Sequence, residues 1–227
     1  MTVSEWTPVV RALRGAPAHR RAGIGPGAAR RALDLLVAVL GLAVLGVPML
    51  LLMFAVRLES EGPALFRQVR IGQGGRPFTL YKLRSMRVGA GGPEVTAGAD
   101  PRVTWLGQRL RSVALDELPQ LWNVLRGHMT LVGPRPETVA LAARYPAACQ
   151  WVFAYRPGLT GPAQVRLHDA DLFGAQSAVD TGAYLERVVP ARTTIEARYL
   201  SDPTLRATLE VLADTVRHLA GRPVPVR

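Results

Sequence analysis

The sequence predicts an α/β fold, in which a small, mainly helical cytoplasmic domain with a short β-hairpin is anchored by an N-terminal re-entrant membrane helix. Three observations support this fold class. The segment Leu35–Val56 is uncharged and about as long as the ~20 residues that a helix needs to cross a bilayer core. Two runs of alternating apolar residues flank a glycine-rich turn, which is typical of a hairpin. Most other apolar residues recur with helical spacing.

The composition combines this apolar segment with a strongly basic remainder. The chain of 227 residues has a formal net charge of +11, while its mean hydropathy is slightly positive at +0.13. A basic surface attracts polyanions, namely nucleic acid, anionic lipid headgroups or phosphate-rich substrates. The single cysteine, Cys149, excludes an intrachain disulfide and fits a reducing, cytosol-facing environment.

Three segments are expected along the chain. Residues 1–29 form a basic, mobile lead-in, because several glycines and a proline interrupt any helix there. Residues 30–58 form the membrane-inserted helix, which starts too far from Met1 to be a signal peptide and lacks a cleavage site. Residues 59–227 form the cytoplasmic domain, which is long enough for one ordinary core.

The charges around the membrane segment favour re-entry over crossing. Short cytoplasmic flanks carry Lys and Arg, and here both flanks are basic, with Arg30 and Arg31 before the segment and Arg57 and Arg67 after it. Pro48 removes one helix hydrogen bond and clashes with the preceding turn. We therefore expect a helix broken at Pro48 that returns to the same face. A plain spanning helix and a buried soluble helix are the alternatives.

The hairpin is expected to pair Phe66–Ile71 with Phe78–Leu83 around Gly72-Gln73-Gly74-Gly75. These glycines could also cradle a phosphate, but neither a Lys-Ser/Thr pair nor a helix follows them, so a turn is favoured. Residues 89–99 are then predicted to form a flexible surface loop.

Two helices and a rigid elbow are predicted next. The first helix covers Trp105–Val113, and the second lies within LDELPQLWNVLRG, where Asp116 suits the N-cap and Pro119 the first turn. Gly127 is placed to end that helix. The following GPRPE segment is expected to be non-helical and to hold Arg135 between two prolines.

The remaining apolar patterns predict a core tryptophan, a strand and a C-terminal helix. Trp122 lies on an apolar helix face and is expected in the core, and residues 151–155 alternate as a half-buried strand would. An amphipathic helix opens after Pro203 and either packs on the core or lies on the membrane. Its expected apolar stripe is formed by Leu205, Leu209, Leu212, Val216 and Leu219.

The adjacent acids Asp116 and Glu117 are the leading candidates for chemistry. Acids at a helix start also have a purely structural explanation, because they interact favourably with the helix dipole. Nearby arginines favour catalysis, since two carboxylates can hold Mg²⁺ while arginines neutralise a diphosphate, as phosphoryl transfer requires. These arginines are Arg109, Arg111, Arg126 and Arg135.

The motifs LDELPQLWNVLRG and LVGPRPE, in this order, resemble those of the bacterial sugar transferase family, the monotopic phosphoglycosyl transferases that begin undecaprenyl-linked glycan assembly. The likeness extends upstream to GPALFRQVRIGQGGRPFTLYKLRSM and DPRVTWLGQRLR, and downstream to YRPGLTGPAQV and the C-terminal helix. It covers nearly everything after the basic lead-in.

The resemblance implies an enzyme on the cytoplasmic face of the bacterial inner membrane that uses Mg²⁺. It would transfer sugar-1-phosphate from a UDP-sugar to polyprenyl (undecaprenyl) phosphate and release UMP, as the first membrane step of exopolysaccharide or glycoconjugate assembly. Asp116 would be the nucleophile that forms a phosphosugar-aspartyl intermediate, and Asp116 and its partner Glu117 would approach the metal. Arg111 and Arg135 would bind phosphate, Lys82 and Arg84 would be further phosphate contacts or a solvated strand face, and Pro48 would make the membrane break.

The sequence departs from the family pattern without touching the acid pair. Val47 stands where Ser usually precedes the membrane proline, and Ala114 where Ser or Thr is common. His128 replaces a usual Asp, and Pro162-Ala163 replace a usual Leu-Trp.

Two non-catalytic alternatives are a membrane-tethered scaffold and a module that binds anionic lipid or nucleic acid. Because no groove-reading motif occurs, nucleic acid is not an expected partner. The transferred sugar and the oligomeric state stay open.

Overall fold

A computed structural model describes residues 27–89, 91–92, 100–167 and 181–224, so most of the predicted lead-in and of the predicted 89–99 loop lies outside the described residues. The first element is α2, Ala28–Glu59. The others, in chain order, are β1 Leu65–Ile71, the 3₁₀ turn η2 Gln73–Gly75, β2 Pro77–Leu83, α3 Trp105–Ser112, the 3₁₀ turn η3 Leu115–Glu117, α4 Gln120–Leu125, β3 Thr130–Val132, α5 Val139–Ala143, the 3₁₀ helix η4 Ala147–Ala154, β4 Gly158–Thr160, α6 Pro162–Arg166, α8 Thr181–Ala183, the π-helical turn η5 Tyr184–Val188, α9 Val189–Ser201 and α10 Leu205–Leu219.

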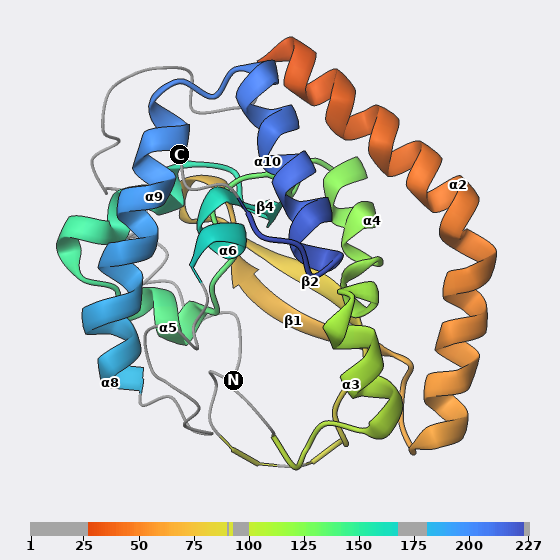
Figure 1. Cartoon of the computed structure of the whole chain (residues 1–227). Helices are drawn as coiled ribbons and strands as arrows, with labels where there is room; N and C mark the ends of the chain where they lie inside the picture. Colours follow the sequence, from red (N-terminus) through yellow and green to blue (C-terminus); the bar gives the residue numbers. More distant parts are fainter. Residues whose placement is uncertain (1–26, 90, 93–99, 168–180, 225–227) are drawn as a thin grey trace.

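Helix α2 is one continuous helix of 32 residues that contains Pro48. The expected break into two helices at Pro48 is therefore wrong in form, because the chain stays helical on both sides of the proline. The axis of α2 changes direction partway along its length (Figure 1). A proline inside a helix is a common cause of such a bend, since it removes a main-chain hydrogen bond without ending the helix.

Both ends of α2 are fastened to the same domain. At its start, the Arg30 guanidinium donates to the Val132 carbonyl at 3.0 Å, and the Asp34 carboxylate accepts the Leu131 N–H at 2.9 Å. At its end, the Arg84 guanidinium donates to the carbonyls of Val56, at 3.0 Å, and of Ser60, at 2.5 Å. These contacts fix α2 along the domain.

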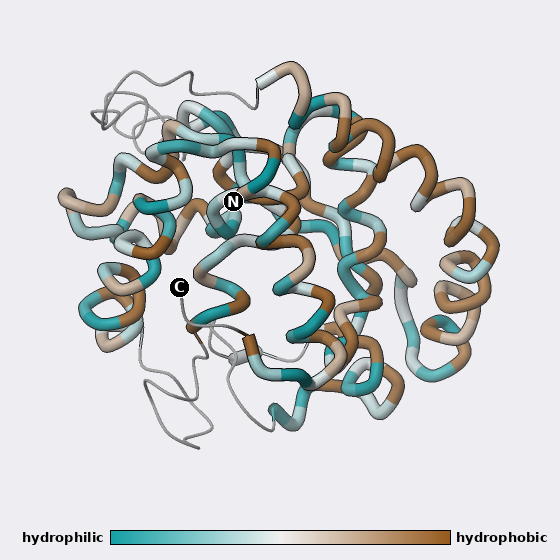
Figure 2. Tube along the Cα trace, turned by 45° about the horizontal axis from the view of Figure 1, so that its top comes forward, coloured by the Kyte–Doolittle hydropathy of each residue, from teal (hydrophilic) through white to brown (hydrophobic). Residues whose placement is uncertain are grey.

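The outer face of α2 is apolar and exposed. By length and composition α2 could cross a membrane, and only 6% of its most apolar window is buried. Figure 2 shows this helix as a mainly hydrophobic rod along one side of the molecule. The exposed large side chains on it are Leu35, Leu36, Val39, Leu40, Val44, Val47, Leu50, Leu51, Phe54 and Leu58.

The predicted hairpin is confirmed. Strands β1 and β2 pair antiparallel, with Phe66 opposite Lys82 and Ile71 opposite Pro77. The hairpin lies between α5 and α9 on one side and α3, α4 and α2 on the other (Figure 1). A second, parallel pair joins β3 to β4, with Val132 opposite Thr160. The sequence did not predict this pair, because three-residue strands are too short to show a periodic pattern.

Two predictions for aromatic residues are wrong. Trp122 is 44% exposed, with the Arg126 guanidinium 5.6 Å from its ring, because α4 buries Leu121 and Val124 instead. Residues 151–154 of the expected strand belong to the 3₁₀ helix η4, and Tyr155 follows its end. Its aromatic side chains pack in the core. Because core residues surround this segment on several sides, the alternation of apolar residues does not indicate a strand with one buried face.

The predicted C-terminal helix is confirmed as α10, which begins after the Thr204 N-cap. Four residues of its expected apolar stripe, Leu205, Leu209, Val216 and Leu219, are exposed. The domain is instead contacted by the adjacent face, where Thr208, Val211 and Asp214 are buried.

Candidate active site

Asp116 lies in a tight turn between α3 and α4. Ala114 has φ 54°, and it is the only non-glycine residue with positive φ in the described ranges. This left-handed residue costs roughly 1–2 kcal/mol and reverses the chain into η3, which carries Asp116 and Glu117. The expected N-cap role of Asp116 is wrong. Pro119 has no N–H to donate to a cap at Asp116, and α4 begins only after it.

A pocket of about 1000 Å³ opens beside Asp116. Among the described residues, nine basic side chains line this pocket and two acidic ones, Asp116 and Glu137, so the pocket attracts anions. The basic residues come from the hairpin, the segments that follow it, the GPRPE elbow and α9. They are Arg67, Arg70, Lys82, Arg84, Arg87, Arg102, Arg111, Arg135 and Arg192.

Glu117 is held by a lysine of the hairpin. The Lys82 ammonium lies 2.6 Å from Glu117 Oε1, so strand β2 and the turn η3 are joined by this ion pair. Burial alone would raise the pKa of Glu117, but the charges of Lys82, Arg135 and Arg70 lower it below its usual value. Glu117 is therefore a stable carboxylate at neutral pH.

Asp116 has a different environment. Its side chain forms no ion pair and no hydrogen bond with another side chain among the described residues, and it accepts a hydrogen bond from its own backbone N–H. Asp116 is only 5% exposed and lines the pocket. Burial raises the pKa of Asp116 above its usual value, and the negative charge of Glu117 adds to this shift, while the charges of Lys82 and Arg111 oppose it. A desolvated carboxylate that has no side-chain hydrogen-bond partner is suited to attack an electrophile.

The predicted phosphate ligands differ in whether their side chains already have partners in the structure. Arg111, in the last turn of α3, and Arg135, in the elbow, line the pocket and have no side-chain partner in the described part of the chain. Arg84 lines the pocket too, but its guanidinium caps the end of α2. A phosphate-binding role for Arg84 stays a prediction, and its observed contacts are structural.

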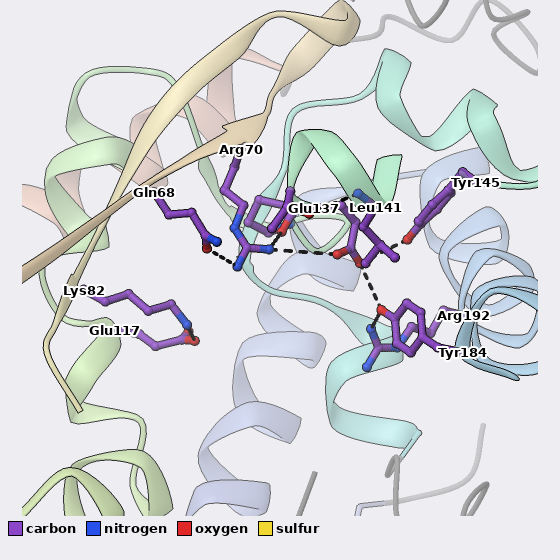
Figure 3. Close-up of polar contacts among 11 residues, drawn as sticks. Gln68, Arg70, Lys82, Glu117, Glu137, Leu141, Tyr145, Tyr184 and Arg192 are labelled. Atoms are coloured by element: carbon purple, nitrogen blue, oxygen red, sulfur yellow. Dashed lines mark hydrogen bonds and ion pairs between the residues drawn. The ribbon is translucent and has the colours of Figure 1, made fainter. Parts of the chain in front are cut away.

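Sequence reasoning missed Glu137, which organises the opposite wall of the pocket. Glu137 Oε1 accepts the hydroxyls of Tyr145, at 3.0 Å, and Tyr184, at 3.1 Å, while Arg70 Nη1 lies 4.0 Å from Oε2. Arg192 donates to the Tyr184 oxygen at 2.6 Å. Figure 3 shows this chain of contacts facing the Lys82–Glu117 pair. The available signal was an acid two residues after Arg135, but its partners Arg70 and Tyr184 are distant in sequence.

The acid pair fits a magnesium ion only together with a ligand. In the described residues, no group of three or more His, Cys, Asp or Glu side chains could hold a metal. Magnesium is usually bound by one or two carboxylates, and substrate phosphates and water complete the shell. Asp116 and the second oxygen of Glu117 could supply those carboxylate ligands, so the residues present fit such a site.

Adjacent carboxylates beside an arginine-lined pocket are features that sites of phosphoryl transfer share. The comparison with known families gives a more specific assignment than these features of the site. The model of the bacterial sugar transferase family matches residues 26–222, and the chain belongs to this family.

Several proteins with assigned names are similar to this chain. A UDP-glucose:undecaprenyl-phosphate glucose-1-phosphate transferase of Caulobacter vibrioides is 50% identical over 142 residues, which are 60% of this chain and 53% of the relative. A putative undecaprenyl-phosphate N-acetylgalactosaminyl 1-phosphate transferase of Bacillus subtilis is 44% identical, over 52% of this chain and 67% of the relative. An Escherichia coli UDP-glucose:undecaprenyl-phosphate glucose-1-phosphate transferase is 42% identical, over 60% of this chain and 30% of the relative. The chain thus spans about half of the first relative and under a third of the last.

Proposed function

We propose that this protein transfers sugar-1-phosphate from a UDP-sugar to polyprenyl phosphate and releases UMP, in the first membrane step of exopolysaccharide or glycoconjugate assembly. The observation that carries the proposal is the Asp116 carboxylate, which has no side-chain partner among the described residues, at the wall of a pocket that nine described basic side chains line. The names of similar proteins support both substrates, since they act on UDP-glucose and undecaprenyl phosphate.

In the first step, an oxygen of the Asp116 carboxylate attacks the β-phosphorus of the UDP-sugar. The bond between that phosphorus and the bridging oxygen breaks, and UMP leaves with the oxygen and its electron pair. Arg111 and Arg135 stand free to neutralise the negative charge that builds up on the phosphates. The raised pKa of Asp116 means that this step slows as the pH falls through a range above the usual value of 3.8.

In the second step, a phosphate oxygen of the polyprenyl phosphate attacks the same phosphorus, and the Asp116 carboxylate leaves. The product is a polyprenyl diphosphate sugar, and the enzyme returns to its starting state. A magnesium ion held by Asp116 and Glu117 would withdraw electron density from the phosphate oxygens. The ion pair with Lys82 holds Glu117 beside the nucleophile, so Glu117 acts by positioning.

The contacts of α2 support a re-entrant membrane position. Arg30 near the start of α2 and Arg84 at its end bind the helix to the same domain. Its 32 residues are about 48 Å long, whereas the hydrocarbon core is about 30 Å thick. Had α2 crossed the bilayer, its ends would lie on opposite sides, where one domain could not hold both. A helix that enters and leaves by the cytoplasmic leaflet is consistent with both contacts.

The proposal is tested by offering UDP-glucose, UDP-galactose and UDP-N-acetylgalactosamine in turn, with Mg²⁺, to detergent-solubilised protein. We expect one or more donors to give UMP, with continuous turnover only when undecaprenyl phosphate is present. A scaffold without catalysis would release no UMP from any donor. Release of UDP in place of UMP would exclude attack at the β-phosphorus.

A further inference from the structure

A much smaller cavity adjoins the large pocket. Its volume is about 10 Å³, which is room for one water-sized group. Arg70, Lys82 and Arg135 line both cavities, so the small cavity lies next to this part of the pocket wall. Among the described residues, Asp116 lines the large cavity and Glu117 lines the small one. We call the small cavity the recess.

The recess contains a buried donor and a buried acceptor that lack partners. Gln120 lines the recess and is 2% exposed, and its Nε2 has no hydrogen-bond partner among the described residues. It follows Glu117 by three residues, a spacing that places two helical side chains on one face. Gln164, at the start of the chain's α6, also lines the recess, and its buried Oε1 likewise has no partner in the described part of the chain. Unpaired buried polar groups are costly, so these two atoms indicate a ligand group that pairs with both.

A hydroxyl group fits the recess in size and in hydrogen bonding. It is about as large as a water molecule, and it donates one hydrogen bond while it accepts others. A phosphate group needs more room than the recess offers. An apolar group would leave both amides unpaired.

The geometry of the transfer indicates which hydroxyl lies near the recess. In an in-line displacement, the attacking and leaving oxygens lie on opposite sides of the phosphorus. UMP therefore departs on the side away from Asp116, while the oxygen that carries the sugar lies to the side of this line. Glu117 directly follows Asp116, and it lines the recess. The recess is thus beside the nucleophile, where the sugar lies, and not at the end occupied by the uridine.

We propose that one hydroxyl of the transferred sugar enters the recess, where it accepts a hydrogen bond from Gln120 Nε2 and donates one to Gln164 Oε1. The inference rests on the proposed function and adds to it the contacts by which the enzyme selects its sugar. A sugar without this hydroxyl leaves the two buried amides unpaired. A site that is built to bind a hydroxyl rejects such an analogue strongly, whereas an apolar pocket discriminates only weakly.

Analogues of the donor test the proposal on the unmodified protein. The donor with the highest kcat/KM among UDP-glucose, UDP-galactose and UDP-N-acetylgalactosamine is compared with analogues that each lack one sugar hydroxyl, with Mg²⁺ and undecaprenyl phosphate present. We expect at least one analogue to lose about 100-fold or more in kcat/KM for UMP release. A series in which no analogue shows such a loss would overturn the proposal.

Two substitutions then assign this loss to the recess. Gln120→Leu and Gln164→Leu keep the approximate volume of the side chain and remove its amide. For each variant, kcat/KM for the full donor should fall about 10- to 100-fold, whereas kcat/KM for the analogue that lacks the recess hydroxyl should change less than about threefold. Gln108→Leu is the matched control, because Gln108 is an exposed glutamine of α3 that is absent from the described lining of both cavities. It should discriminate between the donors as the unmodified protein does.

A fall of equal size for the full donor and for every analogue would overturn the proposal, because the amides would then support the fold or hold an ordered water only. Unchanged kinetics in both variants would overturn it as well. Thermal unfolding shows whether each variant folds, and since the two glutamines are on different helices, one folded variant is sufficient for the comparison. Absence of UMP release from the unmodified protein with every donor is a different result, because it defeats the proposed function itself.

Discussion

Two buried carboxylates on opposite walls of one pocket are used in opposite ways. Asp116 and Glu137 are 5% and 3% exposed, and both lie among arginines. Glu137 accepts two tyrosine hydroxyls and faces Arg70, whereas the Asp116 carboxylate has no side-chain partner among the described residues. Burial, and then the negative charge of Glu137, raise the pKa of Tyr145 and Tyr184, which keeps both hydroxyls protonated as donors. Glu137, whose oxygens have several partners, is part of the wall of the pocket. Asp116, which lacks side-chain partners among the described residues, is available for bond formation.

The largest expected effect is on turnover by Asp116→Asn. The substitution removes the nucleophile and a buried charge without changing the volume, so transfer should fall by a factor on the order of 10⁴ or more. Because the lost charge was unpaired and desolvated, Tm should stay the same or rise slightly. UMP release and thermal unfolding on the same preparation check both parts. A variant with normal transfer would remove Asp116 from the mechanism.

Arg135→Ala is expected to have the next largest effect. Arg135 is exposed and lines the pocket, so its guanidinium is available to a phosphate. Its charge also lowers the pKa of Glu117, which shows that it lies close to the acid pair. Donor kcat/KM should fall about 10- to 100-fold, with little change in Tm. Arg144→Ala is the control, since Arg144 is an exposed arginine at the end of α5 that does not line the pocket. Equal losses in both variants would indicate a general charge effect.

Glu137→Gln sharpens the comparison, because it should mainly affect stability. The neutral amide is a weaker acceptor for two buried tyrosine hydroxyls and no longer attracts Arg70. We expect unfolding to become easier by about 1–3 kcal/mol, with transfer reduced far less than in Asp116→Asn. Chemical denaturation and donor kinetics measure the two quantities. A catalytic loss as large as that of Asp116→Asn, at unchanged stability, would reverse the assigned roles.

Glu196 on α9 is a third case, a buried carboxyl whose effect depends on pH. Burial raises its pKa from 4.5 to about 8, and its Oε2 has no hydrogen-bond partner in the described structure. The folded state therefore keeps a proton on Glu196 that the unfolded state loses. The contribution of Glu196 to stability is fully present below pH 4.5 and is lost as the pH rises to about 8. Glu196→Gln should remove this decline and raise Tm by a few degrees at about pH 8. Parallel Tm profiles for both proteins would contradict the assignment.

The local parts of this picture could be predicted from the sequence. The hairpin, the elbow around Arg135 and the C-terminal helix follow from alternation, prolines and helical spacing, which are properties of neighbouring residues. Asp116 and Glu117 were identified from the arginines near them in the sequence. Asp116 lines the large pocket, and Glu117 lies in the adjacent turn position, held by Lys82.

What failed depends on contacts between distant segments. The turn at Ala114 and the missing N–H of Pro119 move Asp116 out of its expected cap position. The sequence does not show that Glu137 has several partners, because Tyr184 and Arg70 come close to its carboxylate only in the folded chain. The exposed Trp122 shows the same limit, because an apolar helix face does not say which neighbour covers it.

The covalent step is tested most directly by intact-protein mass spectrometry after incubation with UDP-sugar and Mg²⁺ in the absence of acceptor. A mass increase equal to one sugar phosphate is expected on the unmodified protein, with peptide mapping to Asp116 and loss of the increase on addition of polyprenyl phosphate. Asp116→Asn should carry no adduct, and Glu137→Gln should still carry one. A protein that transfers sugar phosphate to the lipid without ever showing this adduct would contradict the central claim.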